Sequence, residues 1–257
     1  MKLDNLEIDV LSDGEFRLDG GAMFGMVPRE RWQKWLSPDG RNRIRMGTHA
    51  ICVRGPDFVL VVEQGIGKGV DEDLFAVSRE TSLESSLRAI GVEPEDVTHA
   101  TCTHWHFDHA GGGGRFPNAA YFVQKREWKA MTRPSVLHNR SYRREDRPPQ
   151  ERTQIIDGDV EILPGVAVRL TGGHTPGHQV VVLEDRALFW GDLFPTQYHL
   201  SPPRTMAYDL FPSDVVERKL ALLAESAEKD WLNYLYHDLD PMPGHIERDG
   251  KRFRFER

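Results

Sequence analysis

The segment from Thr103 to His109 constrains the fold and chemistry of this chain more than any other. It contains three histidines and one aspartate, namely His104, His106, Asp108 and His109. Ala110 and four glycines follow directly. Side chains this polar cannot be buried without a partner, because the loss of hydration is costly. Imidazole binds zinc and related metals, and a carboxylate adds charge for a second cation. We therefore interpret this segment as a metal-binding loop and not as a solvated loop.

A hydrophobic, strand-like segment precedes each group of candidate ligands. Residues 97–102 lead into the loop, and residues 166–170, 187–190 and 234–236 end shortly before His174, Asp192 and His237. Alternate residues of an extended chain point the same way, so His104 and His106 can reach one ion. Asp108 and His109 then turn elsewhere and can serve a second ion. Because the ligands are spread from His104 to His237, a single domain has to hold them all.

This pattern resembles the metallo-β-lactamase superfamily of hydrolases over nearly the whole chain. The resemblance implies an α/β fold, an αββα sandwich of two mixed sheets flanked by helices, with the metals at one edge. It implies a first metal held by His104, His106 and His174. The second metal is then held by Asp108, His109 and His237, and Asp192 bridges both. We prefer His237 to His245 as the last ligand because His237 directly follows a hydrophobic strand, and we interpret His178 as a supporting or structural residue.

The expected chemistry is metal-assisted hydrolysis. Two nearby divalent cations lower the pKa of a shared water, which gives a metal-bound hydroxide at ordinary pH. Asp108 is our candidate catalytic residue, because it can orient the hydroxide or pass its proton to the leaving group. Zinc is the default cofactor, and manganese, iron and cobalt are also compatible with His and Asp ligands. The chain has no G-x-S-x-G motif, and Cys52 and Cys102 lie in hydrophobic runs typical of buried residues.

Three stretches are similar to the quorum-quenching lactonase group of this superfamily: residues 18–25, 191–199 and 206–212. Members open acyl-homoserine lactones, and related enzymes cleave organophosphate triesters, so we expect a small-molecule substrate that is a lactone or related ester. Some lactonases carry a tyrosine shortly after the bridging aspartate, whereas Phe194 and Pro195 follow Asp192 here. Tyr198, His199 and Tyr208 are candidates for the missing hydrogen-bond donor. The expected pocket residues are Met23, Phe24, Phe194, Tyr198, His199 and His245.

Four alternative functions remain open at this point. The hypothesis of a thioesterase like glyoxalase II is weakened, because the sequence shows no obvious additional helical domain. A phosphotriesterase is a further alternative and would use the same fold. Mononuclear-iron sulfur dioxygenases share the HxHxDH motif and would be distinguished by iron content and oxygen uptake. A non-catalytic scaffold is disfavoured because every expected ligand is present.

Composition bounds the partners and the location. The 257 residues are 39% hydrophobic, which is enough for a core, and the net charge of −7 argues against general nucleic-acid binding. We find no apolar signal segment and no run of about 18 apolar residues, so we expect no membrane span. Two cysteines without a disulfide framework fit a reducing compartment. We therefore expect a cytoplasmic protein.

We expect one domain over residues 1–257 with two distinctive segments. Residues 20–48 form an N-terminal arm rich in Met, Phe and Trp, which packs on the core, forms a pocket wall or makes a homodimer contact. Residues 132–152 are an insertion loop rich in Arg, Pro and Tyr, which is either solvated or attracts an anionic substrate. Many relatives have Asp where this chain has Glu63. A helix is predicted from Ser213 to about Lys229, with its apolar stripe at Val216, Leu220, Leu223 and Ala227.

Overall fold

The computed structural model describes residues 1–250 and 252–257 and contains two large mixed sheets. The first sheet has six strands in spatial order: β1 (Glu7–Val10), β4 (Ile51–Arg54), β5 (Val59–Val62), β6 (His99–Thr101), β7 (Ala120–Gln124) and β8 (Thr153–Ile156). The second has seven in spatial order: β15 (Arg252–Glu256), β14 (Gly244–Asp249), β13 (Leu232–Tyr234), β12 (Ala187–Phe189), β11 (Gln179–Leu183), β10 (Val166–Leu170) and β9 (Val160–Leu163).

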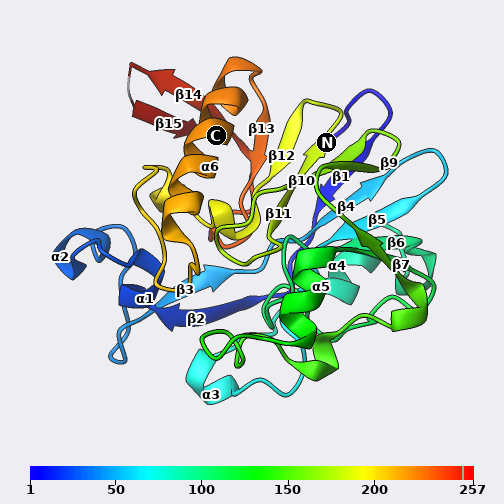
Figure 1. The fold of residues 1–257 in the computed structure, drawn as a ribbon, viewed down its shortest axis with the longest axis horizontal. Coiled ribbons are helices and arrows are strands. Elements are labelled where there is room, and N and C mark those ends of the chain that lie inside the picture. Colours follow the sequence, from blue (N-terminus) through cyan, green and yellow to red (C-terminus); the bar gives the residue numbers. More distant parts are fainter. Residues whose placement is uncertain (251) are drawn as a thin grey trace.

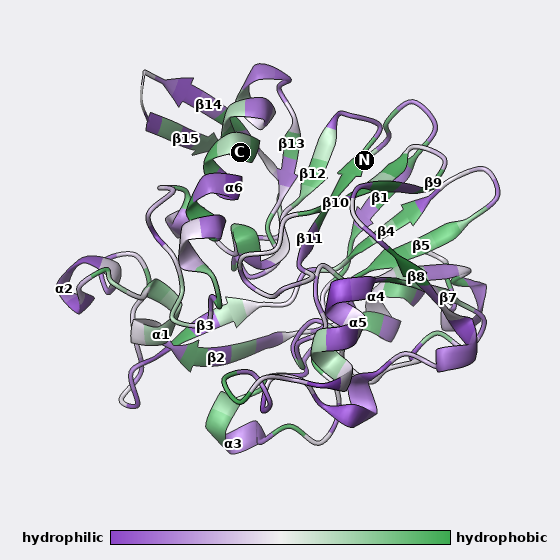
Figure 2. Ribbon diagram, in the orientation of Figure 1, coloured by the Kyte–Doolittle hydropathy of each residue, from purple (hydrophilic) through white to green (hydrophobic). Residues whose placement is uncertain are grey.

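The central strands are hydrophobic on both faces because both faces are covered. In β4, Ile51 and Val53 pack between the two sheets, whereas Cys52 points to the opposite face. This alternation follows from the two-residue period of a strand. In β11, Val181 packs between the sheets and Val180 packs on the outer side. Figure 2 shows β4 and β5 in the hydrophobic colour over most of their length.

Helices cover the outer face of each sheet (Figure 1). On the first sheet these are α4 (Leu83–Ala89) and α5 (Lys125–Thr132), which contribute Leu83, Leu87 and Met131 to its outer core. On the second sheet α6 (Pro212–Glu228) contributes Val215 and Leu223. The layers therefore run helix, sheet, sheet, helix, and the expected αββα sandwich is confirmed.

The buried face of α6 differs from the predicted stripe. The buried residues of this helix are Val215, Lys219, Leu222, Leu223 and Ser226. Of the predicted residues, Leu223 is fully buried and Ala227 packs against the same core cluster, whereas Leu220 is 48% exposed, so the predicted stripe is wrong in part. The hydropathy pattern missed this face of the helix because the face includes the polar residue Lys219. Nζ of Lys219 donates a hydrogen bond of 2.6 Å to the Arg204 carbonyl. A lysine whose charge is satisfied in this way can occupy a buried position that a hydropathy pattern assigns to solvent.

The N-terminal arm forms a small structure of its own beside the sandwich. It contains β2 (Glu15–Asp19), α1 (Gly20–Phe24), α2 (Arg29–Trp32) and β3 (Arg43–Gly47), and β2 pairs with β3 as a two-stranded sheet. The short helix α3 (Glu72–Phe75) contacts β2. Phe16, Trp32 and Ile44 are fully buried in a separate apolar cluster. The arm therefore packs onto the molecule, as one of the sequence interpretations expects.

Helix length and hydropathy bear on the membrane expectation. Within residues 1–250 and 252–257, no helix has both the length and the apolar character required to cross a bilayer.

Candidate metal centre

The candidate ligands come together in three overlapping groups at one edge of the sandwich. Within each group, one ligand atom per residue lies within 4.8 Å of the others. The groups are His104 with His106 and His174, His104 with His109 and Asp192, and Asp108 with His109 and His237. These are the seven residues that the sequence pattern singled out, and every one of them is buried. The first and the third of these groups correspond to the two metal sites expected from the resemblance.

Asp192 lies between these two groups with one oxygen facing each. Its Oδ2 atom is 3.3 Å from Nε2 of His174. Its Oδ1 atom is 3.3 Å from Nε2 of His237 and 3.4 Å from Nε2 of His109. A carboxylate in this orientation can bind two cations at once, one through each oxygen.

Local backbone structure places these side chains where strands end. The loop after β6 turns tightly, because the amides of His109 and Ala110 donate to the His106 carbonyl. Gly191 precedes Asp192 with φ of 53°, and a Cβ there would lie 2.4 Å from Oγ1 of Thr103. Only glycine fits both the left-handed backbone and this close approach. The strand end that carries Asp192 can therefore pack directly against the histidine loop.

The second nitrogen of each ligand histidine faces a fixed partner, which orients the ring. Nδ1 of His174 lies 2.8 Å from Oδ1 of Asp209, whose side chain is 1% exposed. Nδ1 of His237 lies 2.9 Å from the carbonyl of Gly47, at the end of β3. The rings of His174 and His237 are therefore oriented with Nε2 toward Asp192. Sequence reasoning assigned no role to Asp209 or Gly47. Asp209 lies in the stretch 206–212 that resembles the lactonase group, but nothing local to either residue indicates which histidine it contacts.

The Glu63 carboxylate faces His109. Its side chain is longer than that of an aspartate, but this extra length does not prevent the contact. Its Oε1 atom lies 3.3 Å from Nδ1 of His109 and accepts hydrogen bonds from the hydroxyl and amide of Thr103. Glu63 is completely buried with φ of 71°, an uncommon backbone conformation for a residue other than glycine. The carboxylate therefore reaches the metal loop from a strained backbone position.

His138 is a further residue that sequence reasoning missed. Nδ1 of His106 faces the metal-binding group, 3.2 Å from Nε2 of His174, so its Nε2 is free to donate to Nδ1 of His138 at 3.2 Å. Nε2 of His138 in turn lies 3.0 Å from the carbonyl of Tyr208. Burial, and then the neighbouring His174, lower the pKa of His138 to about 4, so this ring is neutral near pH 7. The insertion loop thus supplies a hydrogen-bonded support for His106.

Glu127 joins three segments around the histidine loop. Its Oε1 accepts from the Trp105 amide at 2.9 Å and from the Tyr142 hydroxyl at 2.8 Å. Its Oε2 accepts from the Thr175 hydroxyl at 2.6 Å and from the Gly177 amide at 3.2 Å. This buried carboxylate therefore holds the first ligand loop, the His174 loop and the insertion loop in register.

A cavity of about 170 Å³ opens onto the candidate ligands. Its apolar wall includes Leu18, Met23, Phe75 and Phe107, and Tyr208 lies on it. Burial raises the pKa of Tyr208 to about 12, which keeps its hydroxyl protonated. Met23 is thus the one expected pocket residue that the structure places on this cavity. Tyr208, a candidate hydrogen-bond donor, lies there too.

The structure places the other expected pocket residues elsewhere. Phe24 stacks on His199, whose ring nitrogens are occupied by Oγ1 of Thr196 and the Met23 carbonyl. Phe194 is buried against Trp190 and Phe255, on the outer side of the second sheet.

Tyr198 and His245 are also turned away from the cavity. Tyr198 stacks on Trp35. His245 is 45% exposed and pairs with Asp230 at 2.8 Å, on the far side of β13 from the ligands. These five expectations are corrected for one reason, because closeness in sequence to a ligand or to the apolar arm does not fix the direction of a side chain.

Burial and neighbouring charges set the protonation of the ligands. Burial, and then the neighbouring imidazoles, lower the pKa of His104 and His106 well below the usual range, so both are neutral. Burial alone would lower the pKa of His109, but Asp192, Glu63 and Asp108 outweigh it and raise this pKa. Three carboxylates around one imidazole indicate excess negative charge at this point.

The donor set fits divalent cations. Among the described residues, Nε2 of His109 and Oδ1 of Asp192 face the ligand group and are buried without a hydrogen-bond partner. Such groups are costly unless a ligand satisfies them. Imidazole nitrogens and carboxylate oxygens within 4.8 Å of one another are the donors that zinc and its neighbours prefer.

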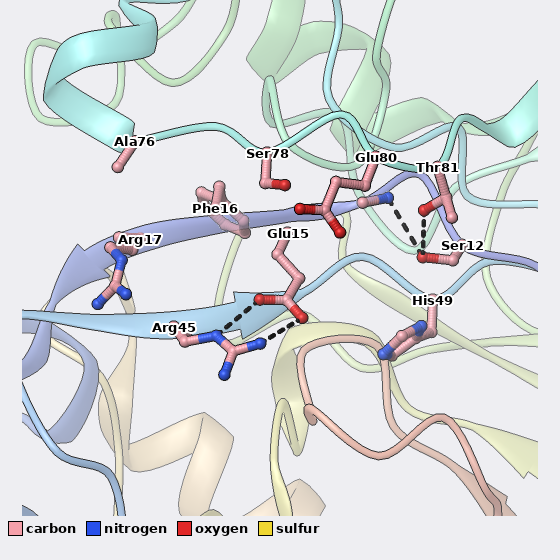
Figure 3. Close-up of a pocket in the computed structure, with 11 residues that line it drawn as sticks. Ser12, Glu15, Phe16, Arg17, Arg45, His49, Ala76, Ser78, Glu80 and Thr81 are labelled. Atoms are coloured by element: carbon pink, nitrogen blue, oxygen red, sulfur yellow. Dashed lines mark hydrogen bonds and ion pairs between the residues drawn. The ribbon is translucent and has the colours of Figure 1, made fainter.

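A larger cavity of about 440 Å³ contains none of these ligands. Figure 3 shows that its polar lining includes the ion pair between Arg45 and Glu15, whose nearest atoms are 2.8 Å apart. His49 also borders it. Because the donors here form no cluster with metal-binding geometry, size alone does not identify the functional cavity.

The fold and the His/Asp cluster together define a class of metalloproteins. Residues 44–237 match the family described as the metallo-beta-lactamase superfamily. This range includes all seven candidate ligands. The chain belongs to the metallo-β-lactamase superfamily, as the sequence resemblance predicted.

Individual relatives include lactonases. An N-acyl homoserine lactonase of Bacillus thuringiensis is 39% identical over 108 residues, which make up 42% of this chain and 41% of that enzyme. The match thus spans less than half of the curated relative. A solved structure described as a probable metal-dependent hydrolase from Staphylococcus aureus has a TM-score of 0.93 and 28% identity, covering 100% of this chain and 98% of that one. The dizinc quorum-quenching lactonase AidC has a TM-score of 0.83 at 20% identity, covering 99% and 95%, and shares the fold.

Proposed function

We propose that this protein is a dinuclear metal-dependent hydrolase that opens lactones or related carboxylic esters. The observation that carries the proposal is the orientation of Asp192, with one oxygen toward His174 and the other toward His237. The relationship to N-acyl homoserine lactonases supports the choice of lactones. The small cavity with apolar walls supports an uncharged reacting group, such as a lactone ring.

Zinc is the metal we propose, because the donors are mostly imidazole nitrogens. His104, His106 and His174 would hold one ion, and Asp108, His109 and His237 the other, with Asp192 shared. Two such ions would polarise the carbonyl group of the substrate and lower the pKa of a bound water toward neutral pH. The protein supplies the fixed ring orientations through Asp209, Gly47 and His138.

Asp108 is our candidate for moving the proton. Its Oδ2 atom lies 3.6 Å from Nε2 of His237, and the residue lies on the cavity surface. The Tyr236 hydroxyl donates to its backbone carbonyl, which fixes the position of the residue. A carboxylate held in this place can take a proton at Oδ and deliver it to the departing alkoxide. The protonated Tyr208 hydroxyl is available on the same cavity to donate a hydrogen bond to the substrate.

A cytoplasmic location remains our expectation. Cys52 and Cys102 are both buried and unpaired, which fits a reducing compartment. The homodimer remains a prediction.

The proposal is tested by ring opening of a long-chain acyl-homoserine lactone. Proton release is followed for zinc-loaded protein, for protein treated with chelator, and for chelated protein to which zinc is returned. We expect turnover that chelation removes and zinc restores. Turnover of thioesters or phosphotriesters in place of every lactone would contradict the substrate class, and iron-dependent oxygen uptake would contradict hydrolysis.

A further inference from the structure

The insertion loop carries a positive charge that the rest of the chain does not share. Residues 132–152 contain six arginines and three acidic residues, a net charge of +3 in a protein of net charge −7. Much of this charge is already committed. Arg143 pairs with Glu145 at 2.8 Å, Arg147 donates to the Met131 carbonyl, and Arg152 donates to the Phe116 carbonyl.

Arg140 differs from these arginines because it lies on the cavity above the candidate ligands and its side chain has no partner among the described residues. It is exposed, and its guanidinium makes no hydrogen bond or ion pair with any residue that the structure describes. Outside the ligand groups, the cavity is also lined by the apolar Leu18, Met23, Phe75 and Phe107 and by the uncharged polar Ser141 and Tyr208. Apart from the ligand histidines, Arg140 is therefore the one basic side chain on this cavity.

The backbone that carries Arg140 is held firmly against the metal loop. The Ser141 carbonyl accepts from the Phe107 amide at 2.9 Å, between the ligands His106 and Asp108. On either side, His138 contacts His106 and the Tyr142 hydroxyl donates to Glu127. Contacts on both sides thus fix the Cα of Arg140, so its side chain stays within reach of whatever fills the cavity.

We propose that Arg140 binds an anionic group of the substrate, a carboxylate or a phosphate, away from the bond that is cleaved. This inference rests on the proposed hydrolase function and specifies its substrate class. A guanidinium offers parallel N–H donors that match the oxygens of either anion. The reacting ester would lie at the His/Asp cluster, and the substrate body would lie along Met23 and Phe107.

The anionic group takes no part in the bond changes. Water oxygen bonds to the acyl carbon, the acyl carbon–oxygen bond of the ring breaks, and the departing alkoxide takes a proton. The product is a hydroxy acid that carries a second anionic group, and one proton is released to solvent as the new carboxylate ionises. Arg140 is therefore a specificity residue that should affect KM more than kcat.

The test uses matched lactones on the zinc-loaded protein. The substrates are 5-oxotetrahydrofuran-2-carboxylate, its uncharged carboxamide, and the phosphate ester of 5-(hydroxymethyl)oxolan-2-one, each followed by proton release. For an exposed ion pair we expect kcat/KM for the better anionic lactone to exceed that for the carboxamide about threefold to tenfold, mainly through KM. The comparison between carboxylate and phosphate identifies the preferred anion.

Arg140→Gln should reduce this preference to near unity, mainly by raising KM for the anionic lactone. Arg144→Gln is the control, because Arg144 is an exposed arginine of the same loop that does not line the cavity. It should keep the preference, which excludes a general effect of loop charge.

The two proposals can fail separately. Chelator-sensitive turnover without a preference for anions, or a preference that survives Arg140→Gln, overturns the role of Arg140 and leaves the hydrolase intact. If no lactone is turned over, the proposed function fails. Calorimetric binding of the same lactones to the zinc-loaded protein then decides about Arg140, whose replacement must remove any preference for the anion.

Discussion

Nε2 of His106 lies 3.2 Å from Nδ1 of His138, a residue 32 positions later in the chain. His138 Nε2 faces the Tyr208 carbonyl and has to donate to it, so Nδ1 of the neutral His138 ring is an acceptor. His106 Nε2 is therefore the donor in this contact and carries the proton. Nδ1 of His106 is then left with a free lone pair, which is the form that binds a metal. The insertion loop is therefore part of the candidate metal centre through a hydrogen bond and not through a ligand.

The first prediction concerns this contact. His138→Ala should weaken zinc binding by about 10- to 100-fold, since removing the partner of a ligand histidine loosens its orientation. Competition with a chromogenic chelator measures the affinity without relying on activity. His245→Ala serves as the control, because His245 is 45% exposed and pairs only with Asp230. Equal zinc affinity of His138→Ala and wild type would show that the loop only packs against the site.

The second prediction concerns Asp192, the carboxylate that we propose binds both metals. Asp192→Asn keeps the shape of the side chain but removes its negative charge, so it should lower bound zinc from two equivalents per chain to one or fewer. Hydrolysis should fall by on the order of 100-fold or more, because a ligand contributes at least as much as the residue that supports it. Metal analysis after gel filtration measures the stoichiometry.

Asp230→Asn provides the matched control for Asp192→Asn, because the Asp230 side chain is 84% exposed and lies away from the ligands. Two retained equivalents with near-normal turnover in Asp192→Asn would contradict the dinuclear proposal.

The third prediction concerns Glu127, which accepts four hydrogen bonds from three segments. Glu127→Gln turns one acceptor oxygen into a donor that faces other donors. The free energy of unfolding should fall by about 1–3 kcal/mol, the range for unsatisfied buried polar groups. Urea denaturation measures this change, and the exposed Glu217→Gln on α6 should leave the midpoint unchanged. A midpoint for Glu127→Gln equal to that of wild type would show that the hydrogen bonds to Glu127 do not stabilise the fold.

The fourth prediction is a pH dependence that arises away from the metal centre. Burial, and then the charge of Lys219, lower the pKa of His199 from 6.5 to about 3. Below pH 6.5 the unfolded chain binds a proton that the folded chain does not bind, so stability falls as the pH falls from 6.5 toward 3. At pH 5.5 this loss is about 1.4 kcal/mol relative to neutral pH.

Urea denaturation in chelator at pH 7.5 and pH 5.5 checks this expectation without a contribution from bound metal. His199→Gln should be less stable than wild type at pH 7.5, because it disturbs the contacts to Thr196 and Met23, and the gap should narrow at pH 5.5. His245→Gln should follow the wild-type pH dependence. A gap that is the same at both pH values would show that His199 does not contribute to acid sensitivity.

The fold class and the candidate ligands could be predicted from the sequence, through its ligand pattern and the family resemblance that this pattern carries. Strand-like segments that end at His104, His174, Asp192 and His237 require an edge where strand ends meet, and the observed sandwich has that edge. These features are readable because they depend on local order, namely alternating hydrophobicity and ligand spacing within a few residues.

The residues that support the candidate ligands, and those that line the cavity, could not be predicted without the packed structure. Asp209 is 35 positions from His174, and Gly47 is 190 positions from His237. Phe194 follows Asp192 closely in sequence, yet it packs on the outer side of the second sheet. Lys219 occupies a buried helix position because a distant carbonyl accepts its hydrogen bond. Such partnerships arise when separate segments pack together, so no local pattern of residue types encodes them.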